Sequence, residues 1–166
     1  MSSLKRRDVV KALLENRGEL LVIAGLGSTA WDITAAGDSP LSFPLWGAMG
    51  QAAMMGLGSL ATIGVQRPAN LSIVVIDNER YGETGMQTTH TANGIDLEGV
   101  ARACGLRICS PGFDSMRKEI QAREGPNFAA VKVQAEKIPL VLPPREGALL
   151  KARFRRAMLG PEADSV

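Results

Sequence analysis

Cysteine and histidine are scarce in this sequence, which has two cysteines and one histidine in 166 residues. Cys104 and Cys109 lie five positions apart and have no metal-ligand partners near them in the sequence. A disulfide scaffold is therefore not expected, and both cysteines are expected to be reduced, small and partly buried, as is usual in a cytoplasmic protein.

Strong net charge and long apolar runs are absent as well. A formal charge of +2 gives no reason to expect nucleic acid or an anionic membrane as a partner. The longest apolar stretch, residues 48–63, is interrupted by glycines and Gln51, which argues against a membrane span. A charged amphipathic segment follows the first residues, where a secretory signal would have an apolar core. We expect one domain over residues 1–166, in the cytoplasm, with residues 144–166 as a C-terminal helical tail.

Helical and strand patterns alternate along the chain. Short apolar, β-branched runs predict strands, and apolar residues at helical spacing predict helices. The strands are expected at 19–25, 71–77 and 128–134, and the helices at 4–16, 28–36, 48–64, 96–104, 115–123 and 146–159. The stretch 39–47, which has two prolines within five residues, is expected to be an extended loop. The alternation predicts an α/β fold with a mainly parallel sheet flanked by helices.

A polar loop follows the clearest strand, Leu71–Asp77, in the segment "VVIDNERYGETGMQTTH". In parallel sheets ligands bind beyond the carboxyl ends of the strands, where this loop falls. The oxygen of Asn78 suits magnesium, which shares its coordination shell with phosphate groups. The backbone amides around Gly82, Thr84 and Gly85 are suited to face an anion. The residue types alone slightly favour a plainer interpretation, a surface loop in which Asn78 makes a local turn.

The same segment, together with "LWGAMGQAAMMGLG" and "GSLATIG", resembles the diphosphate-binding domain of thiamine diphosphate enzymes. Within that family it is similar to the sulfopyruvate decarboxylase beta subunits and the phosphonopyruvate decarboxylases. The resemblance extends from the N-terminal helix to about Val133. It implies a lyase subunit that uses thiamine diphosphate and Mg²⁺ to decarboxylate a 2-oxo acid with an anionic head group.

The resemblance assigns a metal site and part of the cofactor site. The side chain of Asn78 and the backbone carbonyl of Arg80 match the magnesium ligands. Met49 matches the apolar side chain that holds the cofactor bent, and the carbonyl of Gly47 matches an acceptor for its aminopyrimidine. Without the resemblance, a core methionine is the simpler interpretation of Met49. The cofactor-binding residues are then Gly47, Ala48, Met49, Gly50, Tyr81, Gly82, Thr84 and Gly85.

His90 is the second catalytic candidate after Met49. It follows Thr88 and Thr89 in the loop, and a histidine side chain suits a general acid or a hydrogen-bond donor to substrate or phosphate. A lone histidine in a loop is more often simply solvated. Tyr81 is equally consistent with packing and with a role in the site.

One family signature is missing. The family has a Gly-Asp-Gly turn whose aspartate is the other magnesium ligand, and no Gly-Asp-Gly occurs in this chain. "MMGLG" runs directly into "SLATIG", which indicates that one strand–turn–helix unit of about 25–30 residues is lacking. A genuine deletion, a cloning event and a record that omits a segment would each produce this pattern. Asp77 and Glu79 are neighbouring carboxylates, but they are expected to point differently from the ligand they would replace. Magnesium and cofactor should then bind weakly.

The resemblance also implies a partner. In this family the catalytic glutamate belongs to a pyrimidine-binding domain, expected here on a separate alpha subunit. The chain would then be half of an active site, in a homo- or hetero-oligomer, and residues 48–63 are the expected surface for a homodimer. Two alternatives remain. One is a degenerate scaffold of the same fold. The other, weaker, is an unrelated nucleotide-binding module, for which "GLGSTA" is only a partial glycine motif.

Overall fold

The structure, a computed structural model, describes residues 4–25, 27–45 and 60–164. The chain divides into two compact units, residues 1–6 with 53–137, and residues 7–52 with 138–166. Each unit has its own parallel strands and its own helices. The organisation as one domain stays a prediction.

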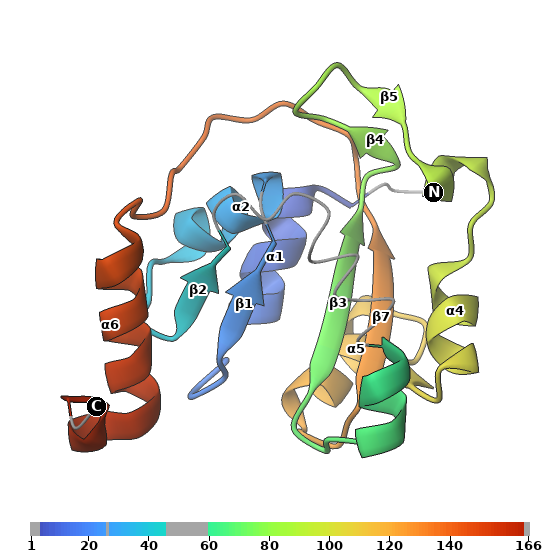
Figure 1. The fold of residues 1–166 in the computed structure, drawn as a ribbon. Coiled ribbons are helices and arrows are strands. Elements are labelled where there is room, and N and C mark those ends of the chain that lie inside the picture. Colours follow the sequence, from blue (N-terminus) through green and yellow to red (C-terminus); the bar gives the residue numbers. More distant parts are fainter. Residues whose placement is uncertain (1–3, 26, 46–59, 165–166) are drawn as a thin grey trace. The chain divides into compact units, whose positions relative to one another are not determined.

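The first unit contains a parallel sheet of three strands in the order β3-β7-β6. Figure 1 shows the long strands β3 and β7 side by side and pointing the same way, with the β4–β5 hairpin beyond their carboxyl ends. A helix over residues 60–66 precedes β3. The elements of this unit are β3 (Ser72–Asp77), β4 (Arg80–Tyr81), β5 (Gln87–Thr88), η1 (His90–Asn93), α4 (Leu97–Ala103), β6 (Arg107–Ile108), α5 (Phe113–Gln121) and β7 (Asn127–Lys132).

Helices cover both faces of this sheet. On one face Phe128 of β7 packs with Leu60 of the helix 60–66 and with Ala101 of α4, all of them buried. On the other face the fully buried amide of Asn127 donates to the carbonyl of Glu119 in α5, with 3.1 Å between the two atoms. The capping carboxylate of Asp96 starts α4 by accepting from the backbone N–H of Gly99 at 2.9 Å. The layers position the carboxyl ends of β3 and β7 next to each other.

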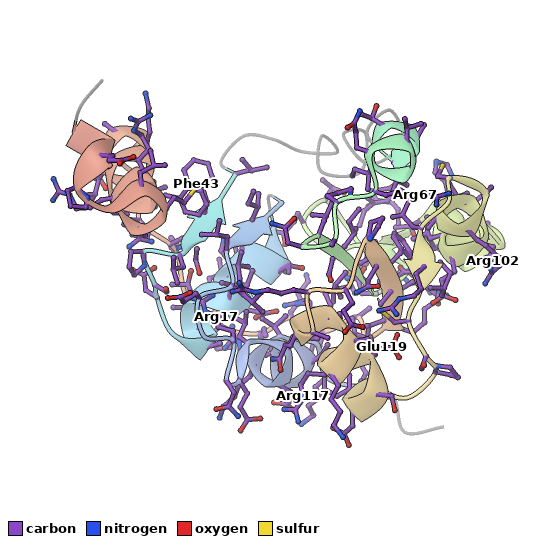
Figure 2. The ribbon with its side chains drawn as sticks, turned by 90° about the horizontal axis from the view of Figure 1, so that it is seen from below. Arg17, Phe43, Arg67, Arg102, Arg117 and Glu119 are labelled. Atoms are coloured by element: carbon purple, nitrogen blue, oxygen red, sulfur yellow. The ribbon has the colours of Figure 1, made fainter. Side chains whose placement is uncertain are left out.

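The second unit is built around two short parallel strands, β1 and β2, paired from Val22↔Ser42 to Ala24↔Pro44. Helix α6 packs against β2, the strand that carries Phe43 (Figure 2). The rings of Phe43 and Phe154 lie 5.1 Å apart between centroids. Arg153 of α6 donates two hydrogen bonds to Asp38, at 2.7 and 2.8 Å. The elements are α1 (Arg6–Leu14), β1 (Val22–Ala24), α2 (Ser28–Ala36), β2 (Ser42–Pro44), α6 (Gly147–Leu159) and η2 (Gly160–Asp164).

The predicted fold class is confirmed, because the parallel strands are flanked by helices. The helix predicted at 28–36 has the observed bounds of α2, Ser28–Ala36. The loop predicted for 39–47 was wrong in part, because residues 42–44 form β2. Among the described strands β2 pairs only with β1, so Pro44 lies on an edge strand, where a missing N–H is tolerated. The lack of one strand–turn–helix unit stays a prediction.

Residues 47–50 and most of the helix predicted at 48–64 lie outside the described residues; the described end of that helix, from residue 60, is helical. Within the described ranges, every helix is too short or too polar to cross a membrane.

Candidate functional site

Two overlapping side-chain turns follow the end of β3. The carboxylate oxygen Oδ1 of Asp77 accepts from the backbone N–H of Glu79 at 2.8 Å. The amide oxygen Oδ1 of Asn78 accepts from the N–H of Arg80 at 3.1 Å. Asx turns of this kind end a strand and reverse the chain. Glu79 has a φ of 57°, in the left-handed region, so contacts around it must hold the turn in place.

The β4–β5 hairpin continues directly from this turn, with Arg80 opposite Thr88 and Tyr81 opposite Gln87. One position earlier, the carbonyl of Glu79 accepts from the N–H of Thr89 at 3.1 Å. Hydrogen-bonded and non-hydrogen-bonded pairs alternate in antiparallel strands, so Arg80 belongs to a non-hydrogen-bonded pair. Its carbonyl therefore points away from β5, toward the outer edge of the hairpin, where its N–H meets the amide oxygen of Asn78.

The two carboxylates of the turn are bound by one lysine. The ammonium nitrogen of Lys132, at the end of β7, lies 2.8 Å from Oδ2 of Asp77 and 2.5 Å from Oε1 of Glu79. The hydroxyl of Thr91 donates to Oδ1 of Asp77 at 2.8 Å. Burial by itself would raise the pKa of Asp77, but the hydrogen bonds from Lys132, Glu79 and Thr91 outweigh it and lower that pKa. Burial likewise opposes the charge on Lys132, and its two carboxylate partners raise its pKa overall.

The turn therefore offers neutral oxygens to a cation, and its carboxylates are already engaged. The amide oxygen of Asn78 accepts one hydrogen bond and has a second lone pair. With the carbonyl of Arg80 it forms a pair of hard oxygen donors on one edge. Magnesium accepts such donors when phosphate oxygens and water complete its shell. Within the described part of the chain, no three His, Cys, Asp or Glu side chains are placed to hold a metal ion.

The other predicted site residues of this loop lie along the hairpin and after it. A Cβ on Gly82 would lie 3.8 Å from the amide nitrogen of Asn78, which places Gly82 beside that side chain. At the tip, the hydroxyl of Thr84 lies 3.1 Å from Oε1 of Gln87, and Gly85 has a φ of 140°. Tyr81 is 49% exposed. His90 is exposed and begins η1, one residue before Thr91, whose hydroxyl contacts Asp77.

The sequence pattern predicted no role for Lys132 or Thr91. Both belong to the site because β7 is the neighbour of β3 in the sheet and because the chain after β5 returns to Asp77. One sequence signal could have pointed to Lys132: it is a lysine near the carboxyl end of the apolar strand predicted at 128–134. Without the strand order, that lysine has no assigned neighbour.

Comparison with known proteins finds relatives that align with most of this chain. No protein-family model matches it. It is 31% identical over 186 aligned positions to sulfopyruvate decarboxylase subunit beta of Methanocaldococcus jannaschii, covering 93% of this chain and 97% of that protein. It is 31% identical over 154 positions to the corresponding subunit of Methanothermobacter thermautotrophicus, covering 79% of this chain and 83% of that protein. It is 28% identical to phosphonopyruvate decarboxylase of Streptomyces viridochromogenes, covering 92% of this chain but 46% of that protein.

These alignments are longer than the part of the chain that they cover. Since 93% of 166 residues is about 154, about 32 of the 186 positions aligned with the Methanocaldococcus protein have no residue in this chain. Since 92% of 166 residues is about 153, about 29 of the 182 positions aligned with the Streptomyces protein likewise have no residue in this chain. The identity and the nearly full coverage of the Methanocaldococcus protein decide the relationship. The chain belongs to the family of the sulfopyruvate decarboxylase beta subunits and the phosphonopyruvate decarboxylases.

Proposed function

We propose that this chain is the diphosphate-binding subunit of a thiamine diphosphate-dependent decarboxylase that acts on a 2-oxo acid with an anionic head group. Its relatives are named as sulfopyruvate and phosphonopyruvate decarboxylases. The observation that carries the proposal is the contact of the Asn78 amide oxygen with the Arg80 backbone, beyond the carboxyl end of β3. The hairpin register, from which we infer that the Arg80 carbonyl faces the same edge, supports it. Ligands of α/β proteins bind at this end of the sheet.

In this proposal Asn78 and Arg80 hold Mg²⁺ against the diphosphate, and the hairpin residues Tyr81, Gly82, Thr84 and Gly85 line the diphosphate pocket. Met49, within the segment 47–50, supports the cofactor's bent conformation. When bound, the cofactor supplies a nucleophilic carbon and an electron sink for decarboxylation. The chain's own residues bind and orient it. Because Asp77 and Glu79 are paired with Lys132, the metal has only neutral protein ligands, and we expect it to be held weakly.

The proposal includes the loss of one strand–turn–helix unit between β2 and β3. Among the described strands, β1 pairs only with β2, and β3 pairs only with β7. Ile23 in the middle of β1 is 65% exposed, and the apolar residues 73–76 of β3 are only partly buried, although interior strands of parallel sheets are normally covered. The alignment positions without a residue in this chain support the same inference.

A partner subunit completes the active site in this proposal. The two archaeal relatives are named as beta subunits, which implies a second kind of subunit in those proteins. We infer that an alpha subunit supplies the pyrimidine-binding half and the catalytic glutamate, in a hetero-oligomer. His90 is then the candidate in this chain for contact with substrate or phosphate.

A calorimetric titration with thiamine diphosphate and MgCl2, with and without a candidate alpha subunit, tests the proposal. We expect saturable binding that requires MgCl2 and that Asn78→Ala weakens. Asn70→Ala is the matched control, because Asn70 is an exposed asparagine just before the opposite end of β3. An absence of binding in both arrangements, or an equal loss in the two variants, would refute the proposal.

One observation favours a second candidate, a non-catalytic scaffold of the same fold. The Gly-Asp-Gly turn that would carry the metal-binding aspartate is missing from the sequence, and Lys132 engages the two carboxylates on either side of Asn78. A scaffold would bind the alpha subunit, and its titration with thiamine diphosphate would show no heat of binding. Co-purification of the two subunits without cofactor binding would identify it.

A further inference from the structure

Lys132 connects three separate parts of the first unit. Its own strand β7 lies beside β3, and its ammonium group bridges Asp77, the last residue of β3, and Glu79, two residues into the turn. The carboxylate of Asp77 is 7% exposed, whereas the side chain of Lys132 is 57% exposed. A single cation at the rim of the sheet therefore fixes both carboxylates that flank Asn78.

The other contacts of the turn converge on the same carboxylate. Oδ1 of Asp77 accepts from the N–H of Glu79 and from the hydroxyl of Thr91, each at 2.8 Å, which leaves Oδ2 for Lys132. Glu79 has a left-handed backbone, which is unfavourable for a residue with a Cβ. The ion pair with Lys132 holds the side chain of that same residue. The bridge therefore joins the left-handed residue of the turn to β7.

Lys132 is poorly suited to bind an anion itself. Two carboxylates within 2.8 Å neutralise its charge, so little of it remains for a phosphate or an anionic substrate. Nor does it supply oxygen to a metal. Among the described residues, its ammonium group is hydrogen-bonded to Asp77 and Glu79.

We propose that Lys132 is a positioning residue, which acts through Asp77 and Glu79 to set the orientation of Asn78 and Arg80 toward a magnesium diphosphate group. This inference rests on the proposed function for the identity of the group. The fixing of the turn is a property of the chain alone. Residues that orient metal ligands typically change metal affinity by about 10- to 100-fold when they are replaced.

The test uses the full chain and four variants. Lys132→Met removes the bridge, Lys132→Arg keeps a cation that can contact two carboxylates, and Glu79→Gln weakens one arm at a side chain that is 45% exposed. Lys118→Met, an exposed lysine on α5, is the matched control. Two quantities are measured: the exchange rates of the Glu79 and Arg80 amide hydrogens, and the affinity for thiamine diphosphate with MgCl2.

Lys132→Met should speed exchange of both amides and weaken cofactor binding by about 10- to 100-fold. Lys132→Arg should keep most of the slow amide exchange and most of the cofactor affinity. Lys118→Met should change neither quantity. Should Lys132→Met fail to fold, Glu79→Gln must show the same two effects at smaller size. If Lys132→Met leaves the exchange rates of the two amides unchanged, the bridge does not hold the turn. If exchange is faster but the affinity for thiamine diphosphate is unchanged, Lys132 is not a positioning residue. Wild-type chain that binds no cofactor would instead refute the proposed function, and exchange would still decide whether the bridge holds the turn.

Discussion

Replacement of Gly64 by alanine should destabilise the first unit, because this glycine touches the backbone at the end of α4. A Cβ built on Gly64 would lie 1.7 Å from the carbonyl oxygen and 2.9 Å from the carbonyl carbon of Cys104. These are backbone atoms, so no side-chain rotation relieves the contact. The helix 60–66 and α4 would have to separate by about 2 Å to reach an ordinary contact distance, and both carry residues of the core around Phe128.

The size of the effect follows from two opposing terms. Alanine in a helix interior is favoured over glycine by about 1 kcal/mol, which stabilises the variant. Overpacking a well-filled core costs about 1–3 kcal/mol, and the upper end applies here because the clash involves rigid backbone. We expect a net loss of about 2 kcal/mol. With a urea m-value of about 2 kcal/mol/M, the unfolding midpoint should fall by about 1 M.

Urea unfolding followed by circular dichroism measures this shift. Gly147→Ala is the matched control, because no atom lies within 4 Å of a Cβ at this position in the first turn of α6. It should leave the midpoint unchanged or raise it slightly, since alanine is the better helix former. A Gly64→Ala midpoint equal to or above that of the wild type would show that the two helices do not approach as closely as described.

Three further predictions concern stability and reactivity. Asn127→Ala should lower the free energy of unfolding by about 2–3 kcal/mol, because it removes a fully buried amide that accepts from Arg107 at 2.8 Å and donates to the carbonyl of Glu119 at 3.1 Å. A change under about 0.5 kcal/mol in urea unfolding would contradict this. The hydrogen bonds from Arg153 lower the pKa of Asp38 although burial opposes them, so this pair stabilises the fold fully above pH of about 4 and is lost as the pH falls further. Asp38→Asn should remove that part of the loss of stability in acid. The removed part should be less than about 1 kcal/mol, because Asp38 is 45% exposed, and urea unfolding midpoints of both proteins between pH 3 and 6 measure it. Burial raises the pKa of the Cys109 thiol, so Cys109 should be alkylated more slowly than the partly exposed Cys104 near pH 8, and equal rates by mass spectrometry would argue against its burial.

Local patterns predicted most elements well. The β-branched run at 71–77 predicted β3, and the helix expected at 96–104 is α4, which begins at Leu97 with Asp96 as its cap. The strands that were not predicted are β2, β4, β5 and β6, each of two or three residues. Such short segments carry too few residues for an alternating pattern, and their pairing depends on partners that are distant in the sequence. The two-residue strand β6, for example, exists because Arg107 and Ile108 lie beside Asn127 and Phe128.

The sequence by itself determined the α/β class, the family, and the position of Asn78 at the end of a strand, because these depend on local periodicity and on motifs of neighbouring residues. Only the tertiary structure decided that Lys132 binds Asp77 and Glu79, across 55 and 53 positions of sequence. The pairing of β3 with β7 brings them together. Strand order arises from packing the whole sheet against its helices, and no local pattern encodes it.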